Sequence, residues 1–400
     1  MKDFIFYAPT EVAFGVNAES QLVDFTRKYK QDGPVLIIYG GGSARRSGLL
    51  DRIEKQYNDA GIAYVMKGGV QPNPRISLAR ECVEICRKEG VGLILAVGGG
   101  SVVDTAKATG YGVCYEGDVW DIYCGKATPK ASLPVGVVLT IPAAGSEMSD
   151  SSVLSNEETQ QKLGCNSNVC RCKFAIMNPL LSYSLPEYQT ACGAVDIMMH
   201  TMERYFTKET DMLLTSAMAE ALLRTVKTAA DKLLCEENLS EKETYQARAA
   251  IMWASSLSHN DLMGRGIADF ASHKIEHELS ALYDVAHGAG LAAIWSSWAR
   301  YVMNEDISRF VSFAVNVMGV ENDPENPQQT ALKGIEAMEA AYRRWKMPVG
   351  LTELLGHKDT EENILLMANK CTKNGTFRPG YFKSLSTEDV AEILRMANSL

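Results

Sequence analysis

The sequence predicts two domains of different class, a parallel α/β domain over residues 1–185 and an all-helical domain over residues 186–400. In the first half, short and continuously apolar runs alternate with helical patterns of roughly 10–15 residues, as in parallel α/β folds. Two of these runs lead directly into glycine triplets, at 40–42 and 98–100. From Pro186 onward, helical patterns follow one another with Gly, Pro or Asn between them.

Length and composition describe an ordinary globular chain. Its 400 residues, 46% of them hydrophobic, can bury a sizeable core. A net charge of −9 leaves no basic field for nucleic acid or anionic lipid, so we expect neither as a partner. No apolar run is long enough for a signal peptide or a membrane span. Ten cysteines without a secretory signal favour reduced thiols, and we expect a cytoplasmic protein.

The first half contains the expected strands. An early strand with a hairpin-like return is expected over Asp3–Phe14, because apolar residues alternate on either side of Pro9. Continuous apolar runs predict buried strands at Pro34–Tyr39, Gly92–Val97 and Val135–Thr140. The remaining expectations are helices over 19–28, 49–60 and 76–88, a strand at 64–66, and an irregular stretch with short strands over 148–185.

The second half is expected to contain helices alone. Apolar periodicity places them over residues 187–206, 210–235, 240–258, 265–281, 287–303, 306–318, 328–345, 360–370 and 386–399. No tandem repeat is visible, and the two Gly-Gly-Gly-Ser loops have dissimilar flanks.

Five of the six histidines lie between Asp196 and His287. Asp196 and His200 have the i, i+4 spacing that puts two side chains on one helix face, about 5–6 Å apart at Cβ, so one metal ion can bridge them. On an unbroken helix, His273 and His287 would be separated by about 21 Å. If they share a metal, the helix must end within Leu282–Gly288, where a turn would fold His287 back. One aspartate and three imidazoles suit Fe²⁺ or Zn²⁺.

Plainer interpretations exist for these residues. Any single histidine here is more simply a helix-face or core residue, and only the set of four together favours a metal site. The stretch 273–277 is not the zinc-protease pattern, because Lys274 stands where that pattern needs glutamate. The spacings of Cys165, Cys170 and Cys172 fit no common zinc pattern, so no metal cluster is expected there.

The second glycine triplet has the setting of a phosphate-binding loop. Between a buried strand and a helix, glycines let the backbone approach a pyrophosphate, whose charge the helix N-terminus stabilises. Gly98-Gly99-Gly100-Ser101 has this setting, although a tight turn would use the same residues. Asp104 and Lys107 strengthen the prediction by placing a carboxylate and an amine on the first helical turns.

These motifs, in this order, resemble the iron-containing (group III) alcohol dehydrogenases. The resemblance covers nearly the whole chain and is carried by Gly98–Lys107, Thr140-x-Pro-x-x-Gly-Ser-Glu147, Asp196-x3-His200 and His273-x3-His277-x9-His287-Gly288. The chain looks most similar to the butanol dehydrogenase-like branch, whose members resemble NADPH-dependent aldehyde reductases. The resemblance implies a Rossmann-like N-terminal domain, a helical C-terminal domain as in dehydroquinate synthase-like enzymes, and an active site in the cleft between them.

The resemblance also assigns roles to residues. It implies hydride transfer between NADP(H) and a primary alcohol or aldehyde such as butanol or butanal, with Fe²⁺ or Zn²⁺ held by Asp196, His200, His273 and His287. His277 matches the position near the nicotinamide and is the candidate catalytic residue. The implied cofactor-binding residues are Gly40, Gly41, Ser43, Gly98, Gly99, Gly100, Ser101, Asp104, Thr140, Ser146 and Lys162. Ala144, where relatives usually have threonine, and Asn178, where an aspartate is common, depart from the pattern.

The first glycine triplet favours NADP(H) over NAD(H). NAD-preferring members of the family carry an aspartate after the strand that here ends at Tyr39, and a carboxylate there repels a 2′-phosphate. This chain has Gly40, followed by the backbone N–H groups and hydroxyl of residues 41–43 and by Arg45 and Arg46. The alternative is an ordinary glycine turn with solvated arginines.

Other functions remain open at this point. A glycerol dehydrogenase-like polyol enzyme is the nearest alternative, followed by a dehydroquinate synthase-like cyclase and by a nucleotide-binding sensor without turnover. Relatives commonly form dimers, and the aromatic segment Phe4–Phe14 has the pattern of an edge strand that a partner would cover. We therefore expect a homodimer.

Overall fold

The computed structural model describes residues 3–264 and 266–400. The chain divides into two compact units, Tyr7–Ser184 and Leu185–Leu400, and the described residues before Tyr7 group with the second unit. The first unit contains a parallel sheet with helices and the second contains helices, so the predicted fold class is confirmed.

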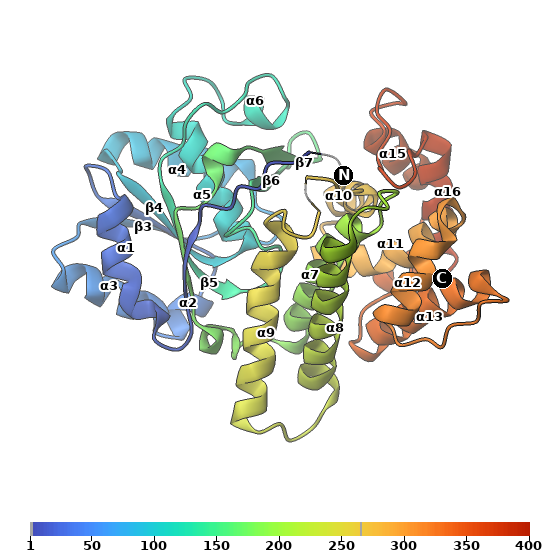
Figure 1. Cartoon of the computed structure of the whole chain (residues 1–400). Coiled ribbons are helices and arrows are strands. Elements are labelled where there is room, and N and C mark those ends of the chain that lie inside the picture. Colours follow the sequence, from blue (N-terminus) through green and yellow to red (C-terminus); the bar gives the residue numbers. More distant parts are fainter. Residues whose placement is uncertain (1–2, 265) are drawn as a thin grey trace. The chain divides into compact units, whose positions relative to one another are not determined.

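The first unit is built around a six-stranded sheet in the order β1-β8-β5-β4-β2-β3, with every neighbouring pair parallel (Figure 1). A separate antiparallel pair is formed by β6 and β7. The strands are β1 (Glu11–Phe14), β2 (Val35–Tyr39), β3 (Tyr64–Lys67), β4 (Leu93–Gly99), β5 (Val135–Ile141), β6 (Ser151–Asn156), β7 (Gln161–Asn166) and β8 (Phe174–Met177). The helices are η1 (Ala18–Gln21), α1 (Leu22–Tyr29), α2 (Ser43–Arg46), α3 (Leu49–Asp59), α4 (Ile76–Glu89), α5 (Gly100–Val113), α6 (Trp120–Tyr123), η2 (Asn168–Cys170) and η3 (Pro179–Ser182).

The continuous apolar runs form the central strands because helices cover both faces of the sheet. From α1 and α3, Leu22, Ile53 and Tyr57 pack against one face, while α5 packs on the other face beside α4. A residue with a Cβ at position 136 would place that atom 2.1 Å from Cζ of Phe174. Glycine in β5 therefore lets the Phe174 ring lie across the strand, which closes the core.

The expected N-terminal hairpin is wrong. β1 pairs in parallel with β8, Glu11 opposite Phe174, and residues 3–10 form no strand. Pro9 has no N–H to donate to a ladder. The residues before it are exposed, Ile5 by 93%. β1 does lie at the edge of the sheet, as expected of this segment.

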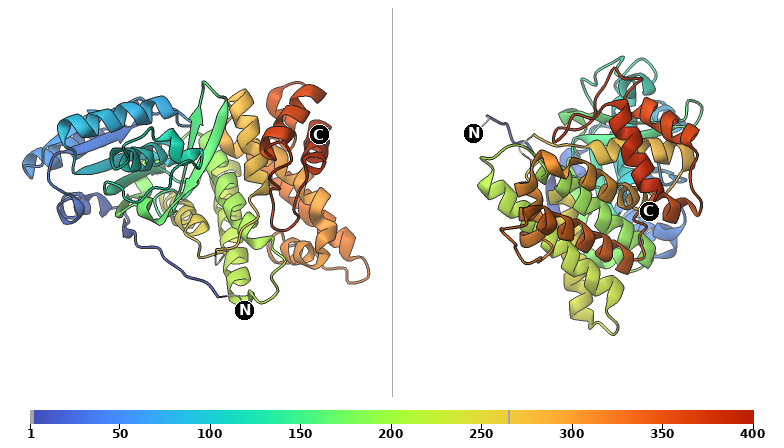
Figure 2. Two further views of the ribbon diagram at one scale, coloured as in Figure 1. Left: turned by 90° about the horizontal axis from the view of Figure 1, so that it is seen from above. Right: turned by 90° about the vertical axis from the view of Figure 1, so that its right-hand side faces the viewer.

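The second unit consists of packed helices in the part of the chain that the structure describes, and Figure 2 shows them from two further directions. They are α7 (Glu187–Tyr205), α8 (Leu213–Cys235), α9 (Glu241–His259), α10 (Ala271–Tyr283), α11 (His287–Val302), η4 (Met303–Glu305), α12 (Ile307–Asn316), α13 (Pro327–Arg344), α14 (Leu351–Leu355), α15 (Glu361–Cys371) and α16 (Thr387–Asn398). Each expected helix is present. The one expected from residue 265, which lies outside the described residues, begins at Ala271, and α14 was not expected. None of the described helices has the length and apolarity needed to cross a bilayer.

Helix α11 is the buried centre of this unit. Its Trp295 and Trp298 are almost fully buried, and α7 packs against it. At the start of α11, a Cβ on Gly288 would lie 2.2 Å from the carbonyl oxygen of Cys192 in α7. Only glycine permits this approach, which brings the first residue of α11, His287, close to α7.

A largely buried carboxyl group on α10, that of Glu278, should make stability depend on pH. Burial raises the pKa of Glu278 to about 7, although Lys370 of α15, 3.9 Å away, acts in the opposite direction. The folded chain then keeps a proton that the unfolded chain has lost, so the free energy of unfolding falls as pH rises from about 4.5 to about 7. Glu278→Gln removes this proton exchange. The change that it causes in the free energy of unfolding should therefore be roughly 1–3 kcal/mol more favourable at pH 8 than at pH 5. Denaturant unfolding at both pH values measures this, and equal effects would contradict it.

Candidate metal and cofactor sites

Asp196 and His200 share one face of α7, as their spacing predicts. The Nε2 atom of His200 lies 3.4 Å from Oδ1 of Asp196, and both residues are buried. α7 is buried along most of its length. Both side chains therefore point into the interior of the helical unit.

The predicted turn between His273 and His287 is confirmed. α10 ends at Tyr283, Asp284 adopts a left-handed conformation with φ 51°, and α11 begins at His287. The imidazole centroids of His273 and His287 are 5.3 Å apart. The Nε2 atom of each lies 3.7 Å from Oδ1 of Asp196.

The resulting arrangement fits a divalent cation. Oδ1 of Asp196 faces three imidazole Nε2 atoms, and ligand atoms of Asp196, His200 and His273 lie within 4.8 Å of one another. Oδ1 of Asp196 and Nε2 of His273 are buried without a hydrogen-bond partner. Buried polar atoms without partners are costly, and coordination by a metal would satisfy them. These three residues, with His287, could hold the ion.

Two buried glutamates contact the Nδ1 atoms of His273 and His287, on the side of each ring away from Asp196. Oε2 of Glu203 lies 2.6 Å from Nδ1 of His273, and Oε2 of Glu276 accepts from Nδ1 of His287. With the proton on Nδ1, the lone pair of Nε2 faces Asp196. The sequence interpretation missed both glutamates. The signal available for Glu203 was its place seven residues after Asp196, two helical turns along the same face.

The electrostatics of the group favour a bound cation. Burial, together with the neighbouring His259 and His273, holds the pKa of His200 well below its usual range. Burial also lowers the pKa of His273, but the carboxylates of Glu203 and Asp196 outweigh it and raise the pKa to about 9. In the chain alone these carboxylates retain a proton on His273. A metal ion would replace that proton and neutralise the same charge.

His200 is held by ring contacts. The imidazole of His259 stacks on it with centroids 3.9 Å apart, and Phe270 meets His200 and His273 edge-on. Phe270 has φ 54°, an uncommon conformation for a bulky residue, immediately before α10. The guanidinium of Arg204 lies 5.0 Å from the Phe270 ring centroid.

His277, the candidate catalytic residue, lies one turn after His273 on α10. Its ring centroid is 6.0 Å from that of His287, and its side chain is half-buried. It is thus beside the candidate metal ligands without joining them.

The second glycine triplet joins β4 to α5 as predicted. Gly98 and Gly99 end β4, and Gly100 and Ser101 begin α5 with Gly99 as its N-cap. A Cβ at Gly98 would lie 2.4 Å from Cγ2 of Val102, and one at Gly99 would lie 2.7 Å from Cβ of Ile141. Both positions require glycine, and the loop presents backbone N–H groups at a helix N-terminus, where a phosphate binds well.

Lys107 has a structural role. Its position on the first turns of α5 therefore does not support the phosphate-loop prediction, although the sequence had suggested that it would. Its ammonium is fully buried and donates to the carbonyl oxygens of Ser146, Ser149 and Ser151, at 2.6, 3.0 and 2.7 Å. Asp104 accepts from the hydroxyl of Ser146 at 2.6 Å and from the N–H of Val153 at 3.0 Å. Asp104 and Ser146, both predicted to bind cofactor, are therefore bonded to each other.

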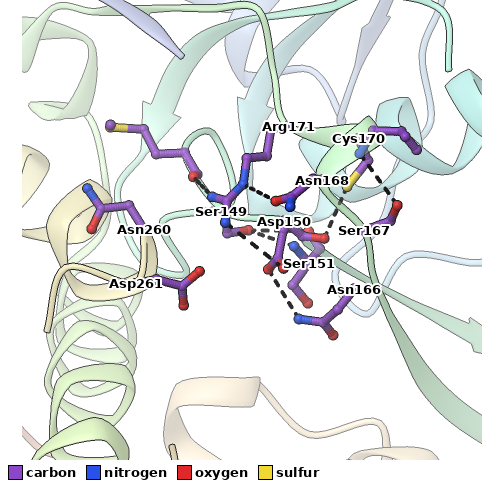
Figure 3. Close-up of polar contacts among 12 residues, drawn as sticks. Ser149, Asp150, Ser151, Asn166, Ser167, Asn168, Cys170, Arg171, Asn260 and Asp261 are labelled. Atoms are coloured by element: carbon purple, nitrogen blue, oxygen red, sulfur yellow. Dashed lines mark hydrogen bonds and ion pairs between the residues drawn. The ribbon is translucent and has the colours of Figure 1, made fainter. Parts of the chain in front are cut away.

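Arg171 also holds the loop before β6. Figure 3 shows Arg171 directed at this loop, where its Nη1 donates to the carbonyl oxygen of Met148 at 2.8 Å and its Nε donates to Asn168 at 2.9 Å. Of the other predicted cofactor residues, Thr140 lies near the end of β5 and Lys162 lies buried in β7 opposite Ser155. Ala144 lies beside Gly100, whose added Cβ would be 3.4 Å away.

The first glycine triplet follows β2 and leads into α2, where Ser43 is the first residue. Arg45 does not add free charge there, because its guanidinium binds Asp51 at 2.7 Å and Glu54 at 2.5 Å. Arg46 instead lies against Gly42, whose added Cβ would be 2.3 Å from Nη1 of Arg46. The prediction that both arginines add charge is therefore wrong for Arg45.

Known proteins resemble the chain over its whole length. The family model "Iron-containing alcohol dehydrogenase" matches residues 9–179, and "Fe-containing alcohol dehydrogenase family, C-terminal" matches residues 190–398. A probable NADH-dependent butanol dehydrogenase of Bacillus subtilis (strain 168) is 38% identical over 99% of both chains. The NADPH-dependent aldehyde reductase of Escherichia coli (strain K12) is 31% identical over 95% of both chains.

Solved structures agree with these matches. The crystal structure of an NADH-dependent butanol dehydrogenase A from Thermotoga maritima has a TM-score of 0.91 and 36% identity, covering 99% of each chain. The family uses a nicotinamide cofactor and a divalent metal. The group formed by Asp196, His200 and His273 fits the metal. The chain therefore belongs to the iron-containing alcohol dehydrogenase family and is a metal-dependent oxidoreductase of alcohols and aldehydes.

Proposed function

We propose that the protein interconverts short primary alcohols and aldehydes, such as butanol and butanal, with NADP(H) and a divalent ion held by Asp196, His200, His273 and His287. The observation that carries the proposal is the convergence of three imidazole Nε2 atoms on one buried carboxylate oxygen, at 3.4, 3.7 and 3.7 Å. The butanol dehydrogenase and aldehyde reductase names of the relatives support this substrate class.

When bound, the ion supplies Lewis acidity toward the substrate oxygen and the nicotinamide supplies or accepts hydride. The chain's part is to fix the ligands and their protonation. Asp196 would provide a negatively charged ligand to the ion, and the imidazoles would provide neutral donors. Glu203 would keep the Nδ1 proton of His273 in place, so that its Nε2 stays available.

His277 is the proposed proton relay to the substrate oxygen. It lies one turn from His273 with its ring 6.0 Å from that of His287, and imidazole exchanges protons near neutral pH. His277→Gln should slow turnover by roughly 10- to 100-fold and flatten the pH profile of kcat, while metal content stays unchanged. Loss of metal in this variant, or an unchanged pH profile, would contradict the relay role.

NADP(H) is the proposed cofactor because the residue directly after β2 is not a carboxylate. Gly40 stands at that position, and Ser43 and Arg46 are available for a 2′-phosphate. The relatives' names include both choices, since the Bacillus subtilis protein is named NADH-dependent and the Escherichia coli protein NADPH-dependent. The proposal therefore rests on the residues after β2.

A screen of carbonyl substrates tests the function. NADPH and NADH oxidation should be followed with butanal, propanal, dihydroxyacetone and glyceraldehyde, and the reverse reaction with butanol and glycerol. We expect the highest kcat/KM with the unbranched aldehydes and NADPH. Preference for dihydroxyacetone and glycerol would favour the polyol enzyme instead, and no turnover with any pair would leave a nucleotide sensor.

A homodimer is proposed for the assembly. β1 lies at the edge of the sheet, and Phe4, Phe6 and Phe14 are between 42% and 49% exposed. Exposed edges of this kind are usually paired or covered, and a second copy would cover this one. Sedimentation velocity at micromolar concentration should show a dimer that Phe4→Ser/Phe6→Ser weakens. A monomeric wild-type protein would contradict the proposal.

A further inference from the structure

His287 is the least enclosed of the four proposed ligands. Its side chain is 26% exposed, compared with 6–7% for Asp196, His200 and His273. It is the first residue of α11, directly after three residues outside any helix. Deep burial therefore restrains its ring less than it restrains the other ligands, so a specific contact matters more at this position.

Glu276 provides that contact, and its own carboxylate is fixed by burial and a second hydrogen bond. It is fully buried on α10, one carboxylate oxygen accepts from Nδ1 of His287, and the other accepts from the hydroxyl of Ser280. Space for the carboxylate depends on Gly290 in α11. A Cβ there would lie 2.9 Å from Cγ of Glu276 and 3.0 Å from its Oε1.

The other histidines show why this contact matters. His273, deeply buried, has the same kind of partner in Glu203. His200 has none at Nδ1, which is buried without a hydrogen bond, and its ring is held by stacking on His259. The imidazoles of His200 and His273 thus each have a specific contact in addition to deep burial. For His287, the most exposed of the three, the specific contact is with Glu276.

We propose that Glu276 is a positioning residue for the metal site: it fixes the Nδ1 proton and ring orientation of His287 so that Nε2 faces Oδ1 of Asp196. The inference rests on the proposed metal site. A purely structural role in α10–α11 packing would make substitutions of Glu276 lower the stability of the metal-free protein. A positioning role predicts that they lower metal affinity by more than any such loss of stability explains. Partners of this kind typically change metal affinity about 10- to 100-fold.

The experiment measures metal binding by the full-length chain rather than turnover. Metal-free wild type, Glu276→Gln, Glu276→Ala and Gly290→Ala are titrated with Zn²⁺ against a chromophoric chelator and with Co²⁺ by visible absorption. Glu278→Gln is the matched control, because it makes the same carboxylate-to-amide change two residues along α10, facing Lys370. Denaturant unfolding of the metal-free forms reports packing separately.

We expect the Zn²⁺ dissociation constant to rise roughly 100-fold for Glu276→Ala and roughly tenfold for Gly290→Ala, with an altered Co²⁺ spectrum in both. Glu276→Gln, whose amide oxygen can still accept from Nδ1, should recover most of the affinity, and Glu278→Gln should match wild type. Wild-type affinity and spectrum in Glu276→Ala would overturn the inference. Asp196→Ala separates the two proposals: if it also binds Zn²⁺ like wild type, the metal site itself is wrong.

Discussion

Replacing Asp196 or His273 by alanine should lower kcat for butanal reduction on the order of a thousandfold and should remove the bound metal. Asp196 is the residue whose carboxylate oxygen faces all three Nε2 atoms. Without it, three neutral imidazoles must hold the ion alone. Without His273, the buried carboxylate of Glu203 also loses its Nδ1 partner and keeps the backbone N–H of residue 273, 3.1 Å away.

Two controls make this result specific. Asp196→Asn keeps the shape of the side chain but removes its charge, and it should lose metal almost as completely as Asp196→Ala. His357→Ala changes an exposed histidine whose Nδ1 lies 3.1 Å from the carbonyl oxygen of Leu355, and it should behave like wild type. Metal analysis and steady-state kinetics on the same samples decide the outcome. Near-wild-type turnover of Asp196→Ala after chelation would exclude the proposed site.

Gly40→Asp should reduce the ratio of kcat/KM for NADPH to that for NADH by roughly 10- to 100-fold. A carboxylate a few ångströms from a 2′-phosphate costs about 1–3 kcal/mol, and each 1.4 kcal/mol is about a factor of ten. An added Cβ makes ordinary contacts at this position, 3.5 Å from the carbonyl oxygen of Val70 and 3.9 Å from Cγ2 of Val102. The change therefore acts through charge.

The matched control for this change is Gly40→Asn, which has the same shape without the charge and should alter the ratio far less. Arg46→Ala should lower NADPH use in the same direction as Gly40→Asp, because it removes the guanidinium near Gly42. Arg45→Ala should have little effect on the ratio, since Arg45 is bound by Asp51 and Glu54. Equal or better use of NADH by the wild type would contradict the NADP(H) proposal.

Local patterns in the sequence were sufficient for most of the fold. Runs such as Val35–Tyr39 and Leu93–Val97 are apolar throughout because helices cover both faces of the sheet, and this signal is present in the residues themselves. The pairing of β1 was missed because its partner β8 lies more than 150 residues later. Nothing in Glu11–Phe14 distinguishes a parallel partner far along the chain from a hairpin partner nearby.

The site was predictable to the extent that it depends on helical spacing and one turn. Asp196 and His200 are brought together by α7 alone, and a turn within Leu282–Gly288 was expected if His273 and His287 share a metal. The roles of Lys107 and Glu276 were not predictable, because both depend on what distant segments place against them. Lys107 meets carbonyl groups about 40 residues later, and Glu276 reaches His287 only after the chain has turned.

The most direct test of the account is metal-dependent turnover by the purified protein. Metal content is measured in the protein as isolated, the metal is removed with a chelator, and NADPH oxidation with butanal is followed before and after addition of Fe²⁺ or Zn²⁺. The account predicts about one metal ion per chain, loss of activity on removal, and recovery with at least one of the two ions. Full activity in protein shown to be metal-free would contradict it.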